Sequence, residues 1–534
     1  MELTTRNIRT YGILCRSDMQ ITLEDDVNVP DTKPDIDQLI KTRGEIQITS
    51  TTPADGKVIL RGTLNFSVLY ITTEDIRPVH CMKGQIPIEE SINMDHLSSD
   101  RDVTCHFDLE DCQSSLINSR KLNIRALVSF HCCQEEEQNL AAGTDIISEE
   151  ASRAEMEQLS SPDGLHKRFD RFSLTQLESW KKDVFRLKDE ISLPKGKPTI
   201  DTVLYCEMTP QNMQHRIVEQ GIRFTGDLLV FLLYIPESDE RTLEYLETEV
   251  PFDDIISCDN CNQDMISDVE YLNFHKEIQL QADEDGENRI LDFEWTLHLK
   301  LRFYQDETFD YLKDAYSTAC TLRLTQQDVK TSRLLMKNQS VVRVSDHIHT
   351  DQSTDTMQQI CNTTGIVQID EQEITENGIV LEGVVELDTL YMTENDARPL
   401  AVAKGTIPFT HTIEIPDISP NDDYELQSNI SQISVIMLDS QEMEAKVILN
   451  LCALVFTHQK EQIITQIAEA PLDMEHIQAM PGLVGLIVER ESSLWDIAKE
   501  YNTTVESIMQ LNDLSSDHVA MGDHLLLVKQ LDGI

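Results

Sequence analysis

The chain has 534 residues, of which 95 are acidic and 44 basic, so its formal net charge is -51. A negative charge of this size repels nucleic acid, because duplex binding needs clustered Lys and Arg to displace counterions. It also disfavours binding to anionic membranes. It suits a solvated acidic surface or a basic protein partner. Hydrophobic residues make up 40% of the chain, which excludes global disorder, and the length allows three or four domains of about 150 residues each.

The N-terminal segment from Met1 to Gln20 carries scattered arginines and lacks the apolar core of a secretory signal. No stretch of about 18 apolar residues predicts a transmembrane helix, so we expect no membrane insertion. We therefore expect the chain to stay in the cytosol of the cell that makes it. The 12 Cys follow no regular framework, which in a reducing compartment predicts buried thiols.

One stretch recurs three times along the chain. Each copy holds a Gly, a Tyr 8 residues later and a Pro 17 residues after the Tyr, at Gly62, Tyr70 and Pro87, at Gly226, Tyr234 and Pro251, and at Gly383, Tyr391 and Pro408. The copies lie 164 and then 157 residues apart, too far for solenoid repeats. Each copy therefore belongs to a separate domain.

Alternating apolar residues around these positions predict strands that are buried on one face. The second copy differs, because Leu228 to Tyr234 is apolar on both faces. Either the second unit packs against something that its siblings do not touch, or this strand is better covered within its own domain. A further alternating strand closes each unit, at 122–130, 291–303 and 447–455. We expect three all-β modules, like sandwiches or barrels.

The spacing of the three repeats along the chain sets the expected domain boundaries. The three β modules are predicted at 7–134, 183–330 and 335–470, and a small C-terminal domain at 483–530. Residues 135–182 form an acidic linker that begins with three consecutive Glu, and its segments 147–159 and 174–182 are expected to be helical. The link at 331–338 is short, so the second and third modules are expected to be docked.

The last 50 residues show a different pattern. A short apolar strand, Val484 to Val488, precedes a capping box in which Ser493 caps a helix and Asp496 bonds back. A second capping box at 503–506 starts another helix, and Leu525 to Val528 is a closing strand. The pattern predicts a small βααβ domain.

These residues give the C-terminal segment a specific resemblance to the LysM domain, in particular Val488, the run Ser493 to Ala498, and Tyr501, Val505, Ile508, Asn512, Gly522 and Leu525. LysM domains usually bind N-acetylglucosamine polymers such as peptidoglycan. The Gly-Asp that commonly precedes the first helix in that family is replaced here by Glu491-Ser492.

Three β modules followed by one LysM domain resemble the SPOCS-domain spore morphogenesis proteins of endospore-forming bacteria. The resemblance implies a structural role in the mother-cell cytosol at the forespore surface. There the LysM domain would bind the coat-basement ATPase SpoIVA, and the β modules would hold other coat proteins. One alternative is a peptidoglycan-binding protein or an accessory to a cell-wall hydrolase. Another is an enzyme whose site lies in one β module.

The chain lacks the sequence motifs of common catalytic sites. It contains no P-loop, no Gly-x-Ser-x-Gly and no His-Glu-x-x-His. Cys258 and Cys261 form a lone pair that favours a loop with two thiols over a zinc site, and His347 and His349 have no third ligand. We therefore predict a protein that is not an enzyme and has no catalytic residues, cofactor or metal.

The candidate partner-binding residues all lie in the C-terminal domain. Trp495 is the first, because Trp is enriched in binding hot spots, and Lys499 lies one helical turn further on. Alternatively, the ring of Trp495 packs on its own helix and the closing strand. The expected rim of the site consists of Glu491, Ser492, Ser493, Asn512 and Asp513.

Overall fold

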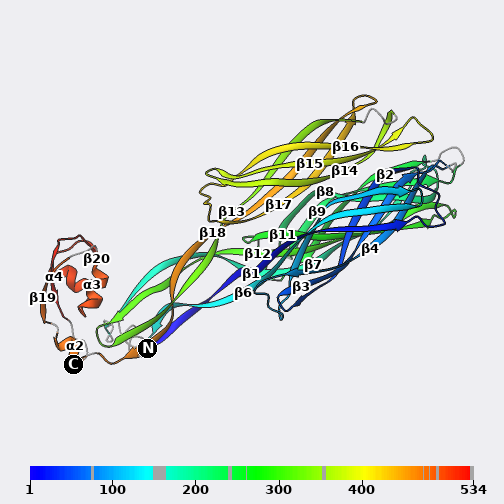
Figure 1. Ribbon diagram of the computed structural model, residues 1–534. Coiled ribbons are helices and arrows are strands. Elements are labelled where there is room, and N and C mark those ends of the chain that lie inside the picture. Colours follow the sequence, from blue (N-terminus) through cyan, green and yellow to red (C-terminus); the bar gives the residue numbers. More distant parts are fainter. Residues whose placement is uncertain are drawn as a thin grey trace.

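The computed structural model describes residues 1–73, 77–147, 164–219, 221–238, 243–259, 261–350, 356–472, 474–479, 481–488 and 492–529. These residues form three elongated β units and a small domain with helices at the C-terminal end (Figure 1). No helix in the described ranges has the length and apolar character needed to cross a membrane.

In the described residues each unit contains six strands. The first is built from β1 (Glu2–Asn28), β2 (Gln38–Ala54), β3 (Lys57–Ile71), β4 (Val79–Asn93), β5 (Thr104–Asn118) and β6 (Lys121–Ile147). The second is built from β7 (Leu165–Ser192), β8 (Ile200–Val218), β9 (Gly221–Pro236), β10 (Glu244–Ser257), β11 (Ile266–Ala282) and β12 (Asn288–Ser317). The third is built from β13 (Thr321–His349), β14 (Met357–Thr375), β15 (Gly378–Thr393), β16 (Leu400–Glu414), β17 (Asp423–Met437) and β18 (Glu442–Ala470).

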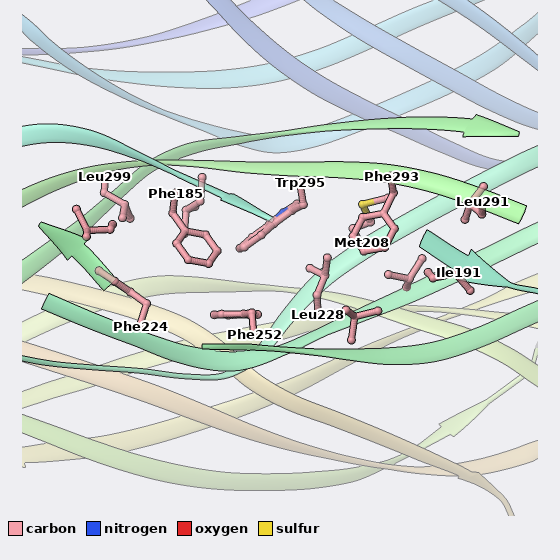
Figure 2. Packing of buried hydrophobic residues seen from close by; sticks show 14 of the residues in the cluster. Phe185, Ile191, Met208, Phe224, Leu228, Phe252, Leu291, Phe293, Trp295 and Leu299 are labelled. Carbon is pink, nitrogen blue, oxygen red and sulfur yellow. The ribbon is translucent and has the colours of Figure 1, made fainter. Parts of the chain in front are cut away.

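Every unit is a sandwich of two antiparallel three-stranded sheets. In the first unit the orders are β2-β3-β4 and β1-β6-β5, and the other two units repeat them. Side chains from both sheets meet in one core per unit. In the second unit the fully buried Trp295 lies 6.1 Å from Phe185 and 6.0 Å from Phe252 between ring centroids (Figure 2). The prediction of three all-β modules is confirmed.

The repeated Gly, Tyr and Pro have separate structural reasons. The hydroxyls of Tyr70 and Tyr234 each donate to the carbonyl of a proline 36 residues upstream, at 3.2 Å. A Cβ at Gly62 would lie 2.4 Å from a backbone oxygen of the neighbouring strand, so only Gly allows this close approach. The prolines lie on β4, β10 and β16, which are edge strands and do not need every backbone N–H in the ladder.

The structure corrects the predicted linker. Residues 135–147 belong to β6 and residues 165–182 to β7, so the helix expected at 174–182 is wrong, and most of the one expected at 147–159 lies outside the described residues. The expected boundaries at 183, 330 and 335 fall inside β7 and β13. The reason is long-range pairing, since β7 pairs with β12 from Leu165 opposite Ser317 to Ser192 opposite Ile290.

Three strand pairs extend beyond their sandwiches and join in a common bundle, which we call the stalk (Figure 1). The pairs are β1 with β6, β7 with β12, and β13 with β18. Its buried core takes side chains from all three units, namely Ile8, Ala142, Phe172, Leu174, Phe309, Tyr311, Val329 and Ile463. Polar contacts also cross it: Arg6 lies 2.9 Å from Glu307, and the Tyr311 hydroxyl donates to Glu461 at 3.0 Å.

A second shared core, which we call the hub, joins the sandwiches themselves. It consists of Leu69, Val79, Cys81, Leu204, Tyr205, Phe231, Leu233, Ile235, Leu243, Cys361, Leu390 and Leu400. The outer apolar face of β9 therefore packs against the other units. The first and third units contribute to this shared core through Leu69 and Leu390. The alternative in which the second unit packs against something that the other two units do not touch is therefore wrong. We call β1 to β18 together, with stalk and hub, the body.

Two cysteines differ from expectation. Cys258 and Cys261 form a disulfide, whereas the sequence suggested two free thiols in a loop. The other ten cysteines are free, and burial raises the pKa of several of them, including Cys112, to about 12, and Cys206, to about 11.

Candidate functional site

The C-terminal domain contains α2 (Met474–Ala479), β19 (Leu483–Ile487), β20 (Ser492–Ser493), α3 (Leu494–Glu500), α4 (Val505–Leu511), β21 (His518–Val519) and β22 (His524–Val528). Strand β19 pairs with β22, and α3 and α4 pack on this sheet around a small core. The predicted βααβ order is confirmed.

Both predicted helix starts are present, one of them shifted. The Ser493 hydroxyl accepts from the backbone N–H of Asp496 at 3.2 Å and caps α3. The cap of α4 is Thr504, which accepts from the N–H of Ser507 at 3.0 Å, so it lies one residue after the expected Thr503. Thr503 is instead fully buried.

Trp495 lies at the contact between α3 and the body. Its indole N–H donates to a carboxylate oxygen of Asp314 at 2.9 Å, and its ring meets Tyr316 edge-on at 4.9 Å between centroids. Tyr316, near the end of β12, is 5% exposed and forms part of the core of the C-terminal domain. Its hydroxyl donates to the carbonyl of Thr503 at 3.0 Å, and burial raises its pKa far above the usual range.

Lys499 reaches the same carboxylate as Trp495. Its ammonium lies 2.7 and 2.8 Å from the two oxygens of Asp314. Positions four residues apart share one face of a helix, which explains why both side chains converge there. The α3 face predicted to hold a partner is thus in contact with the chain's own stalk.

The remaining predicted residues lie elsewhere in the domain. Ser492 and Ser493 pair with Val519 and His518 in a two-residue ladder. The Asn512 amide donates to the carbonyls of Ile508 and Leu526, both at 2.8 Å, so it ties α4 to β22. Asp513 is exposed and adopts a left-handed backbone conformation at φ 53°. Glu491 lies outside the described residues. The structure thus brings together Trp495 and Lys499, which meet at Asp314, and not the full predicted set.

Sequence reasoning missed an apolar face on the outer side of the β19–β22 sheet. Leu483 and Ile487 on β19 are 60% and 55% exposed, and Leu526 and Val528 on β22 are 39% and 37% exposed. The signal was present in the run Leu525 to Val528, because alternation buries Leu525 and Leu527 and leaves the other two side chains outside. We call these four residues the apolar sheet face.

Asp314 and Tyr316 were also missed. They lie more than 180 residues before their partners in the sequence, and a polar or aromatic residue near a strand end is not distinctive by itself. Among the residues that the structure describes, no group of three or more His, Cys, Asp and Glu side chains has the arrangement of a metal site. His347 bonds Glu442 at 2.6 Å, which raises the pKa of His347.

Comparison with known families agrees with this architecture. The family described as "SipL, SPOCS domain" matches residues 35–117, 199–280 and 356–438, and the LysM domain family matches residues 487–527. The chain therefore contains three SipL-type SPOCS domains and one LysM domain. No curated protein and no solved structure matches the chain.

Each SPOCS match spans the second to fifth strands of a unit in chain order, for example β2 to β5 in the first. The six long strands that build the stalk lie entirely outside the matched segments. Both SPOCS and LysM are non-catalytic families, and their combination fits a sporulation-related protein. A LysM domain is typical of binding to peptidoglycan-type polymers.

Proposed function

We propose that this chain is a non-enzymatic assembly protein of the endospore coat. Its LysM domain recruits the body to a SpoIVA-like coat-basement ATPase at the forespore surface, on the mother-cell side, and the SPOCS units hold other coat proteins. The observation that carries the proposal is the place of the LysM domain, which lies at the tip of the stalk, at the end remote from the hub (Figure 1). This placement suits an adaptor that a partner reaches without contact with the sandwiches.

The surface that remains free on the LysM domain favours a protein partner. Trp495 and Lys499 are occupied by Asp314, whereas the apolar sheet face lies open to solvent. Contiguous exposed aliphatic side chains are typical of protein–protein contacts. We therefore assign the ATPase contact to Leu483, Ile487, Leu526 and Val528.

The alternative is peptidoglycan binding, and the LysM match itself favours it. The common Gly-Asp before the first helix is replaced by Glu491-Ser492 in this chain. Glycans also need several hydrogen-bonding side chains, whereas the described strand residues on the outer face of β19 and β22 supply His524 alone. These two features favour the protein partner.

The test is capture of the purified full chain on immobilised SpoIVA-like ATPase and, separately, sedimentation with purified peptidoglycan. We expect retention on the ATPase and loss of that retention in Leu526→Glu, because the variant places a charge in the apolar sheet face. Ile366→Glu on β14 is the matched control, since Ile366 is also about half exposed but lies on the body. Strong peptidoglycan retention with no ATPase capture would reverse the assignment.

A further inference from the structure

A cavity of about 500 Å³ lies between the first and second SPOCS units. Strands β2, β3 and β4 of the first unit and β8 and β11 of the second line it. Three cationic side chains face it, namely Arg43, Lys83 and Lys276, beside the apolar or aromatic Phe66, Tyr205 and Ile278. A volume of roughly 300 to 1,000 Å³ with mostly apolar walls and a few polar groups is typical of small-molecule sites.

The charges at this cavity are unbalanced. Arg43 forms an ion pair with the buried Glu207, to which the Tyr205 hydroxyl also donates at 2.7 Å. The Lys276 ammonium lies 3.7 Å from the same carboxylate, too far for a hydrogen bond. The carboxylate in the lining itself, Glu45, lies 3.6 Å from His275. Arg43, Lys83 and Lys276 thus face two carboxylates, Glu45 and the buried Glu207, which leaves one positive charge in excess.

Several buried polar atoms at the cavity have no hydrogen-bond partner in the part of the chain that the structure describes. They are the ammonium nitrogen of Lys276, Nε of Arg43 and the amide oxygen of Asn65. Native proteins pair almost all such atoms, and an unpaired one calls for a specific explanation. Burial also lowers the pKa of Lys276 to about 8, because its charged form is poorly solvated.

Lys276 departs from the pattern of the repeat. By strand register it lies opposite Trp295, and the equivalent positions in the first and third units are Cys112, opposite Ala126, and Ile433, opposite Val447. Both equivalents pack against the core of their unit. A lysine at a core position lowers the stability of the fold unless an anion compensates its charge. This buried lysine occurs although the whole chain is acidic, with a net charge of -51.

We propose that this cavity binds a small organic anion whose carboxylate or phosphate group pairs with Lys276 and Arg43 and whose apolar part lies against Phe66 and Ile278. A bound anion would neutralise the excess charge and supply the acceptor that Lys276 and Arg43 lack, whereas the amide oxygen of Asn65 would need a donor. Because the walls come from two SPOCS units, the anion would also strengthen their contact. Ligand binding would thus report on the assembled body and not on one unit.

The test is titration of the full chain with benzoate and with phenyl phosphate, followed by calorimetry and by the thermal unfolding midpoint. We expect saturable binding of at least one of the two compounds. The compound that binds more tightly shows whether the site prefers a carboxylate or a phosphate group. Lys276→Met should weaken binding by about tenfold or more, since it removes a charge-assisted contact. Lys446→Met on β18, whose ammonium is exposed, is the control and should bind as the parent chain does.

A second variant covers the case in which Lys276→Met does not fold. Lys83 lines the cavity but is exposed, so Lys83→Glu should fold and should still weaken anion binding through repulsion. No saturation by either compound at millimolar concentration, or equal affinity in the parent chain and both cavity variants, would overturn the proposal.

Discussion

The SPOCS units are joined to one another far more extensively than the LysM domain is joined to the body. Hub and stalk each bury apolar side chains from all three units. Buried ion pairs reinforce them, such as Lys300 of β12 with Glu135 of β6 at 2.5 Å. The described contacts of the LysM domain with the body centre on Asp314 and Tyr316 near the end of β12. The difference indicates one interlocked body and one separable module.

Loss of Arg302 should break the body most severely. This side chain is buried between Asp268 of its own unit and Glu425 of the third unit. Arg302→Met leaves two carboxylates without their cation, so we expect destabilisation by about 3–5 kcal/mol. Urea unfolding followed by circular dichroism measures it. Arg223→Met, which breaks an exposed pair with Asp253, is the control and should leave the unfolding midpoint unchanged.

Phe231→Ala should weaken the hub. Phe231 is fully buried there, between the rings of Tyr205 and Tyr245. Truncation of a buried Phe typically costs about 3–5 kcal/mol. We expect a lower thermal midpoint and faster proteolysis between units, whereas Phe169→Ala, at a site 48% exposed, should change little. Equal stability of the two variants would show that the units are not held together at the hub.

Trp495 distinguishes a partner role from a role in docking the LysM domain. Because Asp314 and Tyr316 hold the indole, we predict that Trp495→Ala weakens capture of the SpoIVA-like ATPase by loosening the LysM domain from the body, while the β units stay folded. Asp314→Ala is the matched variant, because it removes the same contact from the body side and leaves the indole in place. If both variants lose capture equally, Trp495 acts by positioning the LysM domain. If only Trp495→Ala loses capture, the ring itself contacts the partner.

Lys276 should give the smallest effect within any one pH unit, a pH dependence of stability. Its folded pKa of about 8 lies below the ordinary value of 10.5, so between these values the unfolded chain binds a proton that the folded chain has released. Stability therefore rises with pH across this window, by at most about 1.4 kcal/mol per pH unit. The charged and titratable groups that face Lys276 are Arg43, Glu45, Tyr205, Cys206 and Glu207.

Comparison with Lys276→Met isolates this contribution, because the facing groups are the same in both chains. Unfolding midpoints measured from pH 7 to pH 10.5 should converge as the pH rises. Parallel profiles for the two chains would contradict the lowered pKa of Lys276.

The parts of the fold that were predictable from sequence depend on local pattern. The repeated Tyr70 and Tyr234 mark a bond to a fixed upstream carbonyl, and Ser493 caps α3 within one turn. The stalk was not predictable in this way. The run that begins at Glu135 and the segment 174–182 looked like a polar connector, because the partner strands that bury their apolar side lie far away in the sequence. The same distance hid the contact of Trp495 with Asp314.

Recruitment in sporulating cells tests the division between body and LysM domain most directly. The measurement compares the fluorescence of a tagged full chain with that of the same chain lacking residues 483–530, at equal abundance. We expect the full chain to form a shell around the forespore and the shortened chain to remain diffuse in the mother cell. An equally bright shell from the shortened chain would contradict recruitment by the LysM domain.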